Sequence, residues 1–126
     1  MFVFSNRRLG AAAEVLVSRD LAAAMLRAVA AVAAATAASH WERELARWLE
    51  TREVGATPNA GLDVTDLAWS PDHFANQQRF LLDAIAGAGA AAMATAGALQ
   101  RWARLIEAHP RAFVQVGRRW NWAASA

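Results

Sequence analysis

The sequence predicts a small all-α protein built on one long antiparallel helical hairpin, with short helices at both ends of the chain. Two stretches, about 20–52 and 70–109, consist mainly of residues with high helix propensity, and the first contains no Gly or Pro. Residues 54–69 between them carry the Gly, Pro, Asn and Asp residues that form turns and interrupt helices. With 126 residues, the whole chain is expected to form a single domain, 1–126.

The short terminal helices are predicted from capping residues and from proline. Ser5 or Asn6 can cap a helix that runs through Val17, and the following segment, residues 18–20, marks a break or a fresh cap. A further short amphipathic piece is expected over residues 111–116, after a proline.

The second long helix is expected to begin at Ser70, because Ser70-Pro71-Asp72 supplies a capping hydroxyl, a proline at the first helical position and an acid at the positive end of the helix dipole. Its glycines, Gly87, Gly89 and Gly97, suit a place where a partner helix comes close. A kink at Gly87 to Gly89 is the alternative interpretation.

Two alanine-rich segments, about 21–38 and 85–98, lie symmetrically about the loop, as facing segments of an antiparallel hairpin would. Steps of four and three residues define an apolar seam on each long helix. Several large apolar residues fall outside these seams: Leu26, Leu49, Phe80, Leu82 and Met93. Something must cover them, either the terminal segments of the same chain or a second copy. We favour a homodimer that completes a four-helix bundle.

Composition excludes several chemistries. The chain has no cysteine, so it can form neither a disulfide nor a thiolate ligand or nucleophile. It also has no lysine, and its 13 basic residues are all arginine. The net charge is only +2, which makes a nucleic-acid partner unexpected despite a calculated pI near 10.9. No Walker loop or dinucleotide fingerprint is present, and no cofactor is expected.

The alanine-rich segment 21–39 follows two arginines and invites comparison with a membrane span or a signal sequence. Arg27 interrupts it, and alanine inserts poorly into membranes compared with leucine. The sequence therefore favours a soluble buried helix, and we predict a cytoplasmic protein.

An interaction surface is predicted where the two chain ends meet, away from the acidic loop that holds Asp63 and Asp66. Its members are cationic or indole side chains, a mixture suited to phosphate, a membrane surface or an acidic protein: Arg7, Arg8, Arg118, Arg119, Trp120 and Trp122. We favour, over this binding role, a tail that folds back with its tryptophans on the hairpin.

A second, weaker candidate site is polar. The height of residues along the hairpin brings Glu50 near Asp72 and His73, but this trio is only a partial metal or catalytic site. We interpret these residues as caps and surface ion pairs, and expect no metal. The mixed-charge run around Glu42 is interpreted as a solvated helix face.

These observations favour a non-enzymatic helical interaction or scaffold protein that acts as a homo-oligomer with itself or with an unknown protein partner. Two alternatives stay open. One is a small helical enzyme or metal-dependent protein with its site near the loop, and the other is a secreted or membrane-surface hairpin.

Overall fold

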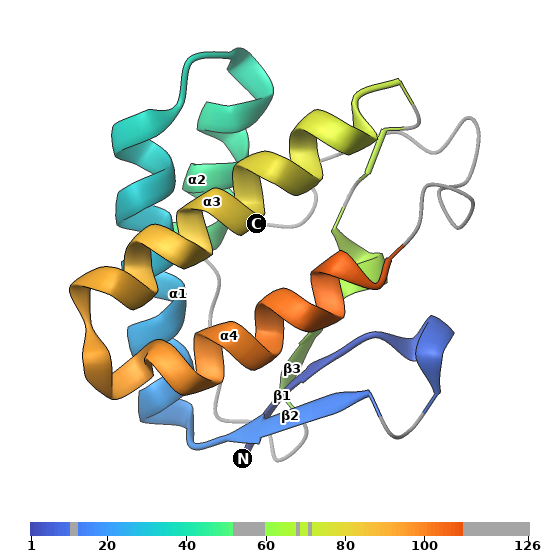
Figure 1. Cartoon of the computed structure of the whole chain (residues 1–126), viewed down its shortest axis with the longest axis vertical. Helices are drawn as coiled ribbons and strands as arrows, with labels where there is room; N and C mark the ends of the chain where they lie inside the picture. Colours follow the sequence, from blue (N-terminus) through green and yellow to red (C-terminus); the bar gives the residue numbers. More distant parts are fainter. Residues whose placement is uncertain (11–12, 52–59, 68, 71, 110–126) are drawn as a thin grey trace.

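The computed structural model describes residues 1–10, 13–51, 60–67, 69–70 and 72–109. Within these ranges, four α-helices pack as two helical hairpins on a small three-stranded sheet (Figure 1). The predicted all-α class and the single long hairpin are therefore wrong. Each predicted long helix is two helices that fold back on each other, so all four helices come from one chain and no second copy is needed to supply two of them.

The sheet is formed by β1 (Phe2–Ser5), β2 (Glu14–Val17) and β3 (Gly61–Asp63), in the order β2-β1-β3. β1 pairs antiparallel with β2, from Phe2 opposite Val17 to Ser5 opposite Glu14. β3 runs parallel to β1, from Gly61 opposite Val3 to Asp63 opposite Ser5. The segment between the two helical hairpins thus pairs, through β3, with the N-terminal strand β1.

The predicted N-terminal helix through Val17 is wrong because these residues alternate between core and solvent. In β2, Val15 and Val17 are buried while Glu14 and Leu16 are exposed, which is the period of a strand. Asn6 does act as a cap, but only of a 3-10 turn, η1 (Arg7–Leu9).

The first helical hairpin consists of α1 (Arg19–Thr36) and α2 (His40–Thr51). The Ser18 hydroxyl accepts a hydrogen bond from the Leu21 amide at 3.1 Å, which confirms a fresh cap at this position. A second cap at Ser39 starts α2 and ends the predicted continuous helix.

The second hairpin consists of α3 (Phe74–Ala91) and α4 (Met93–Glu107). α3 begins four residues after the predicted start at Ser70, whose backbone amide instead donates to the Gln77 side chain at 2.8 Å. The helix breaks at Ala92, so the alternative interpretation, a kink at Gly87 to Gly89, is wrong. A Cβ atom on Gly87 would lie 3.0 Å from Val32 of α1, so here a neighbouring helix does come close.

The core joins the helices to the sheet. The Trp102 ring of α4 lies 4.8 Å from the Phe4 ring of β1, and both side chains are fully buried. Of the apolar residues that prompted the dimer prediction, Leu26, Leu49 and Phe80 are buried within one chain, whereas Met93 is 84% exposed. The described helices include none that is long and apolar enough to cross a membrane.

Candidate functional site

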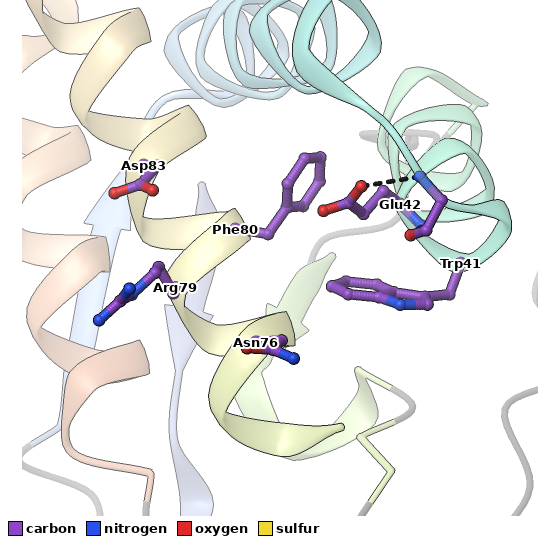
Figure 2. Close-up of a pocket in the computed structure, with 7 residues that line it drawn as sticks. Trp41, Glu42, Asn76, Arg79, Phe80 and Asp83 are labelled. Atoms are coloured by element: carbon purple, nitrogen blue, oxygen red, sulfur yellow. Dashed lines mark hydrogen bonds between the residues drawn. The ribbon is translucent and has the colours of Figure 1, made fainter. Parts of the chain in front are cut away.

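A hollow of about 360 Å³ lies between the start of α2 and the middle of α3 (Figure 2). We call it the α2/α3 groove. It is lined by two aromatic, three charged and two polar residues: Ser39, Trp41, Glu42, Asn76, Arg79, Phe80 and Asp83.

The α2 wall of the groove is held by a reciprocal capping box. The Glu42 backbone amide donates to Ser39 Oγ at 3.3 Å, and the Glu42 carboxylate accepts from the amides of Ser39 at 2.9 Å and Ala38 at 2.7 Å. Both of these last bonds go to Oε1, so Oε2 keeps its acceptor capacity. The cap fixes the carboxylate and the first turn of α2, which carries Trp41.

The α3 wall is formed by side chains three or four residues apart, which share one side of a helix. Phe80 is 9% exposed and meets Trp41 edge to face, with ring centroids 5.7 Å apart. Figure 2 shows the ends of the Arg79 and Asp83 side chains on the side of α3 away from Trp41. The inner lining, which is not exposed, therefore consists of Ser39, Trp41, Glu42 and Phe80, whereas Asn76, Arg79 and Asp83 are exposed.

A second polar cluster surrounds the buried Asp63 at the end of β3. Its carboxylate accepts hydrogen bonds from Ser5 Oγ at 2.8 Å, the Arg7 amide at 2.9 Å, and the amide and hydroxyl of Thr65. Burial acts to raise the pKa of Asp63, but these hydrogen bonds outweigh it and hold the pKa below its ordinary value of 3.8. The cluster ties β1 to the segment that follows β3.

His109 is also buried, and its ring lies 5.6 Å from that of Trp69 and 5.9 Å from that of Phe74. Burial lowers the pKa of His109, while the Asp63 carboxylate opposes this effect. The Gln78 side chain donates to the backbone carbonyl of His109 at 3.2 Å. These contacts anchor the end of α4, so we assign the Asp63 and His109 surroundings a role in holding the fold.

The predicted interaction surface is only partly described. Arg7 forms a 2.6 Å ion pair with Asp66, because β3 brings the acidic loop beside the N-terminus. The predicted separation of an acidic end from a basic end is thus wrong for these residues. Arg8 follows Arg7 in η1 and is exposed. The remaining members, Arg118, Arg119, Trp120 and Trp122, lie outside the described residues, and their binding role stays a prediction.

The weaker polar candidates are all on the surface. Glu50 lies near the end of α2, whereas Asp72 and His73 precede α3, and all three side chains are exposed. His73 stands at the N-terminal boundary of α3 without a side-chain capping bond. In the described part of the chain, no group of three or more His, Asp or Glu side chains is placed to hold a metal ion.

Sequence reasoning missed the groove although a signal for it is present. Ser39-His40-Trp41-Glu42 has the Ser-x-x-Glu pattern of a capping box, which marks a helix start. The sequence interpretation instead placed Glu42 on a solvated helix face.

Comparisons with family models, curated proteins and solved structures find no match for this chain. No function can therefore be transferred from a relative. A function can be assigned only from the side chains of the groove and their arrangement.

Proposed function

We propose that this chain is a non-enzymatic interaction module whose binding site is the α2/α3 groove. The observation that supports the proposal is the pairing of two aromatic rings with acceptor groups around one hollow. Trp41 is half-buried, so part of its ring is open to contact with a partner, and Phe80, which is 9% exposed, packs against it. Aromatic side chains at the centre of an interface typically contribute much of the binding energy.

Two features favour binding over catalysis. The Glu42 carboxylate is tied to the backbone through Oε1, as expected of a fixed contact group. The buried polar side chains Asn6, Asp63 and Gln77 each hydrogen-bond to groups of the fold and line no part of the groove. Acid–base catalysis would need a side chain that accepts a proton from the substrate, together with a second group that orients this side chain.

Self-association is part of the proposal, but fewer exposed apolar side chains support it than the sequence predicted. Leu26, Leu49 and Phe80 are covered within the chain, which leaves exposed apolar side chains such as Leu16 on β2 and Met93 at the start of α4. Light scattering over a range of concentrations tests it, and a mass of 13.6 kDa throughout would contradict a homo-oligomer. The cytoplasmic location predicted from the sequence is likewise a proposal, which fractionation of the native host tests.

The binding role is tested with a displayed library of random peptides selected on the immobilised protein. We expect the selected peptides to lose binding to the variant W41A and to keep it on the variant L16A. Leu16 is the matched control because it is apolar, 56% exposed and on the sheet rather than in the groove. Selected peptides that bind W41A as tightly as the wild type would contradict the assignment of the binding site.

A further inference from the structure

We propose that the α2/α3 groove recognises an arginine side chain presented by a partner peptide. This inference rests on the proposed function and adds the chemical class of the ligand. Its basis is that the inner lining combines aromatic faces with acceptor groups and with one fixed negative charge.

One acceptor, the Glu42 carboxylate, is held in place before a ligand arrives. Glu42 Oε1 accepts the hydrogen bonds from the Ala38 and Ser39 amides, so Oε2 is left to accept from a ligand. The capping box holds the Glu42 carboxylate in this position. The Asn76 side chain makes no hydrogen bond within the described part of the chain and lines the same hollow. A guanidinium has five N–H donors in one plane and can use both acceptors at once.

The rings supply the second half of the site. Figure 2 shows Phe80 reaching from α3 toward the Glu42 carboxylate, with the Trp41 indole lying on the same side of α3. Guanidinium groups stack on aromatic faces, and tryptophan is the strongest partner for a cation. Arginine is also more weakly hydrated than lysine, which favours it in a half-buried site.

Charge argues against an anionic ligand. Among the charged lining residues, Glu42 and Asp83 are negative and Arg79 is positive, but Arg79 and Asp83 both end on the side of α3 away from Trp41, so Glu42 is the charged group on the side of the two rings (Figure 2). An anion in the groove would therefore meet a carboxylate before it met a cation. A purely apolar side chain would contact the rings, yet it would also remove water from Glu42 without giving it a donor.

The test uses short alanine peptides with one central Arg, Lys, Leu or Glu, titrated into the ¹⁵N-labelled full chain and followed by NMR. We expect the Arg peptide to shift the Trp41 indole and Asn76 amide signals and to bind more tightly than the other three. The variant E42Q keeps an oxygen for the cap but removes the charge. It should weaken Arg binding about fivefold, the equivalent of about 1 kcal/mol for two charges 4 Å apart in water.

E50Q is the matched control, because Glu50 is on the same helix, is exposed and lines no part of the groove. It should leave Arg binding unchanged. Equal binding of the Leu peptide, or an E42Q affinity equal to that of the wild type, would overturn the arginine assignment while the groove remained a binding site. A Lys peptide that binds as tightly as Arg would overturn the preference for a guanidinium. If no peptide moves any groove signal, and the selected library peptides bind W41A as tightly as the wild type, the proposed function itself fails.

Discussion

Replacement of Asp63 by Asn is expected to destabilise the fold strongly although it changes only one atom of the side chain. Asp63 is 8% exposed, and its two oxygens accept four hydrogen bonds. An asparagine amide nitrogen in the place of Oδ2 would face the Arg7 backbone N–H, so two donors would meet. An unsatisfied buried donor costs about 1–3 kcal/mol, and hydrogen bonds to a neutral acceptor are weaker than those to a carboxylate by about 1 kcal/mol. We therefore expect D63N to lower the free energy of unfolding by about 2–4 kcal/mol.

Urea unfolding at pH 7, followed by circular dichroism, measures this loss, and D66N is the control. The Asp66 carboxylate forms an ion pair with Arg7, but the two side chains are 44% and 61% exposed. Pairs of this kind contribute less than about 1 kcal/mol. The reasoning is refuted if D63N loses no more stability than D66N, because the hydrogen bonds to the buried carboxylate would then contribute nothing.

The stability difference between wild type and D63N depends on pH because of the pKa of Asp63, which is lower in the folded chain than its ordinary value of 3.8. A carboxyl group with a depressed folded pKa stabilises the fold fully above the unfolded pKa, and this contribution is lost as pH falls through the folded pKa. The difference in unfolding free energy between wild type and D63N should therefore be constant near neutral pH and shrink below about pH 4. A difference that grew on acidification would contradict the sign.

Three further predictions concern one helix cap and three glycine positions, each checked by thermal or urea unfolding. S18A removes the cap of α1 and should cost about 1 kcal/mol, whereas an unchanged midpoint would show that the cap is dispensable. G61A places a Cβ atom 2.7 Å from the Val3 carbonyl oxygen and should destabilise by about 1–3 kcal/mol, since β3 must move away from β1. The Cβ atom of G97A would meet nothing within 4 Å, so this variant should raise the free energy of unfolding by up to about 1 kcal/mol through helix propensity. G87A should raise it less, because its Cβ atom is crowded by a valine of α1. Equal increases in the two variants would contradict the close packing of α1 and α3.

The sequence predicted where helices occur better than where they end. All four helices fall within the two predicted helical stretches, and the cap at Ser18 was recognised. The break before α2 also has a local signal, the capping box from Ser39 to Glu42. The break at Ala92 has none, because it lies in a run of alanines and no side chain caps the helix that begins after it. Its position depends on how α3 and α4 pack together, which the local sequence does not specify.

The sheet was missed for a different reason. β1 and β2 have four residues each, and neither alternates between apolar and polar residues in the sequence, since Leu16, for example, is apolar although it is exposed. β3 has only three residues and becomes a strand by pairing with β1, almost sixty positions earlier in the chain. A pattern that arises only from long-range pairing is not visible in a local window.

The α2/α3 groove depends on the helix break before α2, which the predicted hairpin lacked. In one continuous helix from 20 to 52, the amides of Ala38 and Ser39 would bond to carbonyls of the preceding turn and would not be available to the Glu42 carboxylate. Because the chain instead turns at this point, these amides are free to orient Glu42, and α2 starts again with Trp41 facing Phe80 of α3. The cap that ends the long helix thus also places the charge and the ring that we propose as the binding site. For this reason, a variant that loses the cap, such as S39A combined with E42A, should lose peptide binding together with the order of the first turn of α2, whereas E42Q should lose only the charge-dependent part of binding.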